Sequence, residues 1–475
     1  MSGKNTKQTK AGKKRAKRRK GMCQEDRPIL ENSAAGIDVG AREMFVAVPP
    51  ERDPHPVRVF DTFTEDLQQL ADWLVACGIT TVAMESTGVY WIPLYDILEG
   101  RGLKPCLVNA RHMRNVPGRR TDWHECQWLQ YLHSVGLLRS AFRPEADVCA
   151  VRVLIRHRDE LVQMVSQHVQ HMHKALTQMN LQIHHVISDI TGLTGLAIVD
   201  AILAGERDAA VLARLRDARI KATVDTIRKS LVGNWRPEHL FTLKQSRELY
   251  RSFQQHIVEC DKEIEKLLEE FAPWGDPVEK PLPPDSKRNR SGPKRRKKNG
   301  NPESGFDLRS EAYKLLGVDV TQIPGVETIA LPLFSEVGRD LSRWPTSAHF
   351  ASWLALCPDN DISGGRVLWK GVRKVKNRAG QLFRLAAHSL HRSLTPMGNY
   401  LRRMKAKLGP AAATTATAHK IAIIFYTMVK NQVEYDETNW ATRDAERQKR
   451  FELRLKRQAE RLGYRLVPME ENSAA

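Results

Sequence analysis

The sequence contains no segment long and apolar enough to suggest a membrane-spanning helix. No stretch of its 475 residues approaches the roughly 18 consecutive apolar residues that indicate a span. No apolar segment ahead of a small-residue cleavage site indicates a secretory signal peptide. We therefore expect a protein with no membrane partner.

Cysteine is sparse as well, and its spacing argues against two common roles. The seven cysteines are scattered, with no C-x-x-C pair among them. This spacing argues against a zinc ribbon and against a disulfide framework, so we expect a reducing cytoplasm. The cysteines are Cys23, Cys77, Cys106, Cys126, Cys149, Cys260 and Cys357.

Acidic residues are too few to balance the basic ones. The chain has 75 lysines and arginines but only 55 aspartates and glutamates, which leaves a formal net charge of +20. Such proteins attract polyanions, because neutralising phosphates releases their condensed counterions. Nucleic acid is therefore the expected partner, although a merely soluble basic surface would carry the same charge.

Charge and proline content divide the chain. Residues 1–20 hold ten lysines and arginines and no acid, so we predict a basic disordered tail over residues 1–30. Prolines and two basic clusters predict a linker over residues 273–310. The other expected parts are a first domain at 31–145, a helical coiled-coil region at 146–272, a C-terminal domain at 311–435 and a charged helical tail at 436–475.

Residues 31–145 alternate strand and helix signals. Three consecutive strand patterns precede alternating helix and strand patterns, an order that predicts a mixed sheet covered by helices. This is the order of a RuvC/ribonuclease-H-like domain. The expected strands are 34–39, 44–49, 56–63, 80–86 and 104–109, and the expected helices are 66–77, 90–100 and 122–135.

Beyond residue 145 the patterns are mostly helical, so the expected fold class is α/β plus all-α. Apolar residues recur at alternating spacings of three and four within 150–182 and 245–272. An antiparallel helical hairpin or a coiled-coil dimer interface would satisfy both patterns. The C-terminal domain is predicted to be mostly helical, and its turn at 323–330 fits either a helix-hairpin-helix or an ordinary corner.

Four carboxylates in the first domain could hold metal. Asp38 lies inside an apolar strand pattern, where an acid is unfavourable unless it is paired, hydrogen-bonded or bound to metal. Glu85 closes another such pattern, and Asp122 and Glu125 lie three residues apart on one helix face. Their oxygens suit one or two Mg²⁺ ions. Alternatively, Glu85 begins a loop, and the two helical acids complement the helix dipole.

Several motifs, in order, resemble those of the DEDD transposases of bacterial insertion sequences, a family described as bridge-RNA-guided serine recombinases. The resemblance covers nearly all of the chain between the basic tail and the C-terminal arm. Its motifs are Gly36-Ile37-Asp38-Val39, Met84-Glu85-Ser86-Thr87-Gly88-Val89-Tyr90-Trp91, Asn109-Ala110-Arg111, Gly118-Arg119-Arg120-Thr121-Asp122, Ser188-Asp189-Ile190-Thr191-Gly192, Gly233-Asn234-Trp235 and Ile323-Pro324-Gly325-Val326.

The resemblance implies a RuvC-like N-terminal domain, a C-terminal transposase domain, and a DEDD site made of Asp38, Glu85, Asp122 and Glu125. Glu125 departs from the family, which usually has aspartate at this position, but a glutamate can ligate Mg²⁺ through its longer arm. The resemblance also implies DNA as substrate, a guide RNA and a bacterial, nucleoid-associated protein, and the apolar seams predict a dimer or tetramer.

A candidate nucleophile lies in the segment Asp361–Arg366, which is predicted to be a turn because two glycines follow Ser363. By composition alone, Ser-Gly-Gly is a loop. The resemblance implies that Ser363 is the catalytic serine of the C-terminal domain. Basic residues that could hold phosphates, as any DNA-facing surface would, are Arg119, Arg120, Arg366, Lys370, Arg373, Lys374, Lys376 and Arg378.

The leading hypothesis is a transposase that cleaves and rejoins DNA through a serine–phosphodiester intermediate, with Mg²⁺ held by the acids. One alternative is a RuvC-like nuclease or transposase that uses metal-activated water, for which Ser363 would be structural. The other is a non-catalytic nucleic-acid-binding protein, which would tolerate the loss of Asp38 or Glu85.

Overall fold

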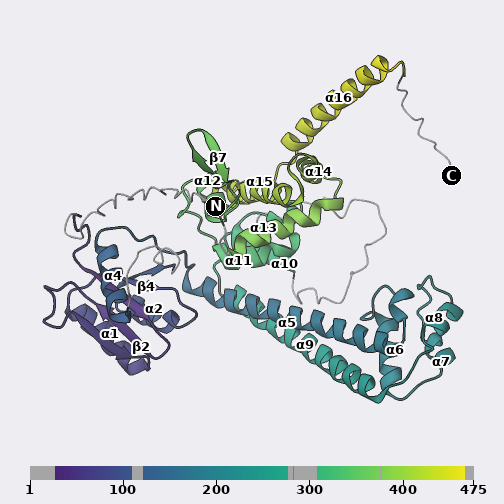
Figure 1. The fold of residues 1–475 in the computed structure, drawn as a ribbon, viewed down its shortest axis with the longest axis horizontal. Coiled ribbons are helices and arrows are strands. Elements are labelled where there is room, and N and C mark those ends of the chain that lie inside the picture. The colour runs from purple at the N-terminus through teal and green to yellow at the C-terminus, as the bar shows by residue number, and fades with distance from the viewer. Residues whose placement is uncertain are drawn as a thin grey trace, which may run out of the picture. The chain divides into compact units, whose positions relative to one another are not determined.

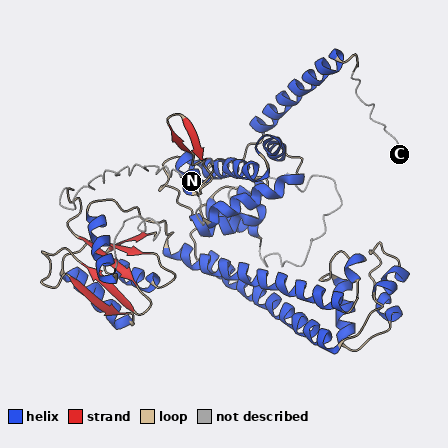
Figure 2. Ribbon diagram, viewed as in Figure 1, coloured by secondary structure: helices blue, strands red, loops and turns tan. Residues whose placement is uncertain are grey.

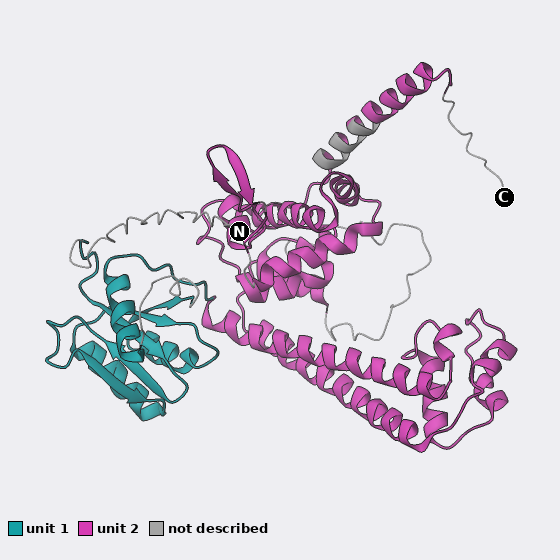
Figure 3. Cartoon of the chain, in the orientation of Figure 1, with its two compact units in different colours: residues 1–143 teal, residues 144–475 magenta. Residues whose placement is uncertain are grey.

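A computed structural model describes residues 27–109, 121–275, 282, 307–369, 371–373 and 377–465. The predicted basic tail, apart from its last four residues, and most of the predicted linker lie outside these residues. The chain divides into two compact units, Met1–Arg143 and Pro144–Ala475 (Figure 3).

The first unit contains a sheet with helices around it (Figure 2). The sheet is mixed and has five strands in the order β3-β2-β1-β4-β5. Strands β1, β2 and β3 form an antiparallel meander, whereas β4 and β5 run parallel to β1. This sheet confirms the predicted mixed α/β domain, and its order is consistent with a ribonuclease-H-like fold. The strands are β1 (Ala34–Val39), β2 (Glu43–Ala47), β3 (Val57–Asp61), β4 (Thr81–Glu85) and β5 (Lys104–Val108).

Helices cover both faces of the sheet. On one face, α1 (Thr64–Ala76) and α2 (Trp91–Gly100) bury their leucines against the central strands, which forms the main core of the unit. On the other face, α4 (Asp122–Ser134) packs along β1, β2 and β4 through two smaller apolar clusters. Burial of apolar side chains on both faces is the main stabilising term for such a layered unit.

The second unit begins with two long helices that lie side by side, α5 (Ala146–Gln178) and α9 (Pro237–Glu269) (Figure 1). They are antiparallel, because Arg158 of α5 pairs with Asp261 of α9, whereas His168, farther along α5, stacks on Phe253, which comes earlier in α9. The predicted seams therefore form a helical hairpin within the chain. Its far end carries α6 (Leu193–Leu203), α7 (Ala209–Arg214) and α8 (Val224–Ser230).

The rest of the second unit is helical apart from one β-hairpin. An aromatic cluster centred on Phe350, Phe383 and Phe425 joins three of its helices. The helices are α10 (Leu308–Leu316), α11 (Ala330–Val337), α12 (Ser347–Trp353), α13 (Arg378–Ser389), α14 (Pro396–Leu408), α15 (Pro410–Asn431) and α16 (Thr438–Arg461), and the hairpin strands are β6 (Asp361–Ser363) and β7 (Arg366–Trp369).

Two features of this helical part bear on the predictions. The turn around Gly325 lies between two short 3₁₀ segments, Val320–Gln322 and Glu327–Ile329, and α11 follows directly. Among the described residues, no helix is long and apolar enough to cross a membrane.

Candidate metal site and candidate nucleophile

Strand alternation decides which way Asp38 faces. Successive side chains of a strand point to opposite faces of the sheet. In β1, Ile37 and Val39 enter the core beneath α1 and α2. Gly36 touches the backbone of α4 instead. Asp38 shares the face of Gly36, so its half-buried carboxyl lies on the α4 side of the sheet.

Glu85 reaches the same side from the neighbouring strand. Ile37 pairs with Met84 in the parallel register of β1 and β4, so Asp38 and Glu85 follow at adjacent carboxyl ends of the two strands. Met84 belongs to the main core, which turns Glu85 toward α4. The Thr87 hydroxyl donates a hydrogen bond to Glu85 Oε1 over 2.8 Å, and this bond limits the rotation of the carboxylate.

Helix α4 supplies the other two carboxylates from its first turn. Its position over the sheet is fixed by a close approach at Gly36 and by two side-chain hydrogen bonds. Gln130 Nε2 donates to the carbonyl oxygen of Ala34 over 3.2 Å, and the Thr81 hydroxyl and His133 Nε2 are 2.8 Å apart. These contacts set the height of Asp122 and Glu125 above the strand ends.

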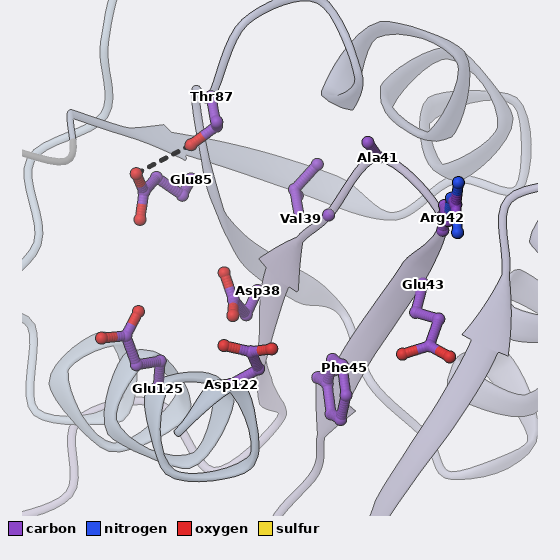
Figure 4. Close-up of a pocket in the computed structure, with 11 residues that line it drawn as sticks. Asp38, Val39, Ala41, Arg42, Glu43, Phe45, Glu85, Thr87, Asp122 and Glu125 are labelled. Carbon is purple, nitrogen blue, oxygen red and sulfur yellow. Dashed lines mark hydrogen bonds between the residues drawn. The ribbon is translucent and has the colours of Figure 1, made fainter. Parts of the chain in front are cut away.

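The four predicted carboxylates gather around one open pocket of about 630 Å³ (Figure 4). Carboxylate oxygens of Asp38, Glu85 and Glu125 lie within 4.8 Å of one another. Asp122 lines the same pocket next to Asp38, but it is more exposed and stands outside this closest group. The structure thus brings together residues that are up to 87 positions apart in the sequence.

The pocket shifts the pKa of Asp38. Burial raises the pKa of its carboxyl to about 6, and the negative charges of the neighbouring carboxylates add to the rise, Glu125 most among them. A hydrogen bond from the backbone of Val39 opposes the shift. A cation bound between these carboxylates would relieve the repulsion that helps to raise the pKa of Asp38.

The donor set fits a hard divalent cation. The closest group offers carboxylate oxygens only, and such oxygens suit Mg²⁺, Ca²⁺ or Mn²⁺ rather than softer metals. Asp38, Glu85 and Glu125 could ligate the ion directly, and Asp122 lies near enough to the pocket to join them or to hold a bound water. If these carboxylates had only a structural role, the charge repulsion between them would remain uncompensated.

Ser363 lies at the end of β6, in the hairpin β6–β7. Gly364 and Gly365 have φ angles of +55° and +75°, which only glycine adopts easily, and they form the two-residue turn of the hairpin. Ser363 pairs with Arg366 across this turn, and both side chains are exposed. The predicted turn is confirmed, and it presents the hydroxyl to solvent.

The basic residues predicted to hold phosphates divide into three groups. Arg366 is exposed beside the serine. Arg373 donates a hydrogen bond to the carbonyl oxygen of Ser352, and Arg378 is bound to Asp159 over 2.6 Å, so both have structural partners. The remaining residues, which lie outside the described part of the chain, are Arg119, Arg120, Lys370, Lys374 and Lys376.

Other residues organise the pocket and were not predicted from the sequence. Thr87 donates a hydrogen bond to Glu85, a role that its motif alone does not reveal. Arg42 of the β1–β2 turn and Glu43 at the start of β2 line the same pocket. Gly36 offers one signal, because a glycine two residues before an acid in a strand can indicate a close helix contact.

Two family models match the chain. The model DEDD_Tnp_IS110, described as Transposase, matches residues 35–181, and a model described as Transposase IS116/IS110/IS902 family matches residues 319–401. The first range contains all four carboxylates of the pocket, and the second contains Ser363. No curated protein matches the chain.

Proposed function

The two matches support an IS110/IS116-type transposase, an enzyme acting on DNA, and on this premise we propose that the chain cleaves and rejoins DNA through Ser363. The single observation that carries the proposal is the carboxylate pocket. Its three closest acids come from β1, β4 and α4, and all lie in one matched range. The serine lies in the other range, in an exposed hairpin turn.

The proposed reaction is a transesterification. The Ser363 oxygen attacks the phosphorus of a DNA phosphodiester, a serine–phosphorus ester bond forms, and the bond from phosphorus to one sugar oxygen breaks. The serine proton passes to a base, and the leaving sugar oxygen takes up a proton. Because one phosphodiester replaces another, a second sugar hydroxyl can reverse the step on a new strand without an external energy source.

The carboxylates would hold Mg²⁺, which when bound stabilises negative charge on phosphate oxygens and lowers the pKa of a coordinated hydroxyl. Asp38, Glu85 and Glu125 bind the ion, and Asp122 completes the set. Thr87 keeps the Glu85 carboxylate oriented. Arg366 contributes a positive charge next to the serine, where it attracts the DNA backbone.

The acids and the serine belong to different units of the chain, so the proposed reaction requires residues of both. We further propose that a guide RNA selects the DNA and that a dimer or tetramer is the active form. The net charge of +20 supports polyanionic partners.

The test is a trapped covalent intermediate. Protein purified with its RNA would be incubated with Mg²⁺ and donor DNA that carries a nick beside the cleavage site. We expect a protein–DNA adduct on a denaturing gel, with its DNA attached to the peptide that contains Ser363. Ser363→Ala should form none, whereas Ser342→Ala, which removes another exposed serine of the same unit, should form a normal amount.

Two results would overturn the proposed role of Ser363 as the nucleophile. Cleavage that persists in Ser363→Ala without any adduct would favour metal-activated water at the carboxylate pocket, a reading that the closeness of the three acids also supports. No cleavage at all, with RNA and target present, would favour a protein that only binds nucleic acid.

A further inference from the structure

Helix α16 (Thr438–Arg461) lies outside both family matches and has no role in the reaction proposed above (Figure 1). Every described side chain from residue 449 to residue 465 is exposed except that of Ala459, which is half-buried. This stretch holds seven lysines and arginines against two glutamates. The surface of this stretch is therefore open to a partner.

The arginines of this stretch gather on one face. Arg450, Arg454, Arg457 and Arg461 follow at spacings of four, three and four residues, which places them within a sector of about 60° around the helix. They span about 16 Å along the axis, over which one strand of B-DNA carries roughly five phosphates. The two glutamates of the stretch, Glu452 and Glu460, lie on other faces.

The identity of these four basic residues indicates a face that binds an anion rather than one that is only solvated. All four members of the row are arginine, whose planar guanidinium binds phosphate through two hydrogen bonds and is less strongly hydrated than an ammonium group. No ion pair joins any of the four to an acid among the described residues. Their charge is therefore available to a polyanion.

A second face of α16 is apolar but short. Phe451, Leu455 and Leu462 lie on it, with exposed fractions of 55%, 39% and 69%. Gln458 interrupts the row, which falls short of the three or four heptads that a coiled coil needs. A second copy of α16 would also bring two arginine rows close together. The charge of the helix therefore favours nucleic acid over self-association.

We propose that the arginine face of α16 is a nucleic-acid-binding site that contacts the phosphate backbone. The site adds a contact outside the two matched transposase ranges, and it rests on the proposed function only for the choice of nucleic acid over other polyanions. The chemistry recognised is a row of phosphates, carried by either DNA or RNA. The contact strengthens binding without reading sequence, because phosphate contacts carry no base information.

The experiment compares two double variants of the full chain that remove the same charge from the same helix. Arg454→Gln/Arg457→Gln changes the proposed face, and Lys449→Gln/Lys456→Gln changes another face. Fluorescence anisotropy would measure binding to a labelled DNA duplex and to an RNA of equal length over a series of salt concentrations. Circular dichroism would check that both variants keep the helix.

We expect the arginine variant to bind nucleic acid about tenfold more weakly at low salt. The magnitude of the negative slope of log affinity against log salt should decrease by about two. The lysine variant should match the wild type. A loss on only one of the two nucleic acids would identify the natural partner, and a loss on both would indicate general backbone binding; either outcome supports the proposal.

Three outcomes would overturn the proposal that α16 binds nucleic acid. They are unchanged binding in the arginine variant, an equal loss in both variants, or binding of α16 to phosphatidylglycerol vesicles with the nucleic-acid affinity of the arginine variant unaffected. A change of mass in sedimentation for Leu455→Gln, together with unchanged DNA and RNA binding by the arginine variant, would assign the helix to self-association. The assay contains no cleavage step, so its result is independent of the Ser363 adduct.

Discussion

Gly36 of β1 lies against the backbone of Gln130 in α4, so closely that a Cβ atom on Gly36 would stand 2.2 Å from the Gln130 nitrogen. The contact lets the helix approach the strand, and the first turn of the helix then stands over the strand end. Glu125 reaches the Asp38 carboxylate from that position. One missing side chain in the strand thus sets the spacing of the carboxylate pocket.

Gly36→Ala should push α4 away from the sheet. The added methyl meets backbone atoms of α4, which cannot rotate aside, so we expect a loss of about 2–3 kcal/mol in stability and a weaker response to metal. Thermal unfolding with and without Mg²⁺ measures both effects. Gly100→Ala is the matched control, since nothing lies within 4 Å of its added Cβ. Equal effects in the two variants would contradict the packing argument.

Asp38→Asn should stabilise the metal-free protein above pH 6. Burial, with help from the neighbouring carboxylates, raises the pKa of Asp38 from 3.8 to about 6. The folded state therefore holds a proton that the unfolded state has lost between those pH values, and stability falls as pH rises through this window. Above it the wild type carries a penalty of up to about 2 kcal/mol, allowing for solvent screening, which asparagine removes.

The same variant should respond less to metal than the wild type does. Saturating Mg²⁺ binds the folded state and should raise the melting temperature of the wild type, but Asp38→Asn lacks one anionic ligand. Melting curves at pH 5 and pH 8, with Mg²⁺ or with a chelator, separate the two effects. A variant that is less stable than the wild type at pH 8 without metal would refute the assignment of this charge repulsion.

Glu125→Asp tests whether the pocket is built around the longer side chain. Shortening the arm by one methylene withdraws an oxygen from the group that lies within 4.8 Å, so we expect metal affinity to fall roughly tenfold, about 1.4 kcal/mol. Titration calorimetry with Mn²⁺ or Mg²⁺ measures it, with Glu43→Asp as a control on the same pocket. Unchanged affinity would show that Glu125 is not a ligand.

Glu336→Ala should destabilise the second unit strongly. The buried Glu336 carboxylate accepts two hydrogen bonds from Arg156 and lies 3.5 Å from Arg378 and 3.7 Å from Arg152. Removing it leaves these cations near one another without their shared anion, at a cost of about 3 kcal/mol. Urea unfolding should show this loss. Glu263→Ala, which breaks an exposed pair with Lys266, should cost less than about 1 kcal/mol.

The first unit was largely predictable because its periodicities are simple. Every predicted strand and helix end in 31–145 lies within two residues of the observed one. Alternating apolar residues reveal strands, and a 3.6-residue period reveals helices, without reference to distant contacts. Asp38 stood out for the same reason: an acid among buried apolar neighbours requires an explanation.

The second unit was less predictable because its organisation depends on contacts between distant residues. The seams in 150–182 and 245–272 fitted either a hairpin or a dimer, and the packing of α5 against α9, with Arg158 paired to Asp261, shows that one chain supplies both helices. Strands β6 and β7 were missed around a correctly predicted turn, although Gly-Gly between β-prone residues is a hairpin signal. Glu336 gave the same signal as Asp38, an acid in an apolar run, and was overlooked.

The most direct test of the account asks whether the carboxylate pocket and the serine act in one reaction. The amount of Ser363–DNA adduct would be measured for the wild type and for Asp38→Asn at equal bound DNA, with Mg²⁺ and with a chelator. We predict that the adduct requires Mg²⁺ and falls at least a hundredfold in Asp38→Asn, about 2.7 kcal/mol. Full adduct formation in Asp38→Asn, or in the presence of the chelator, would contradict a shared active site.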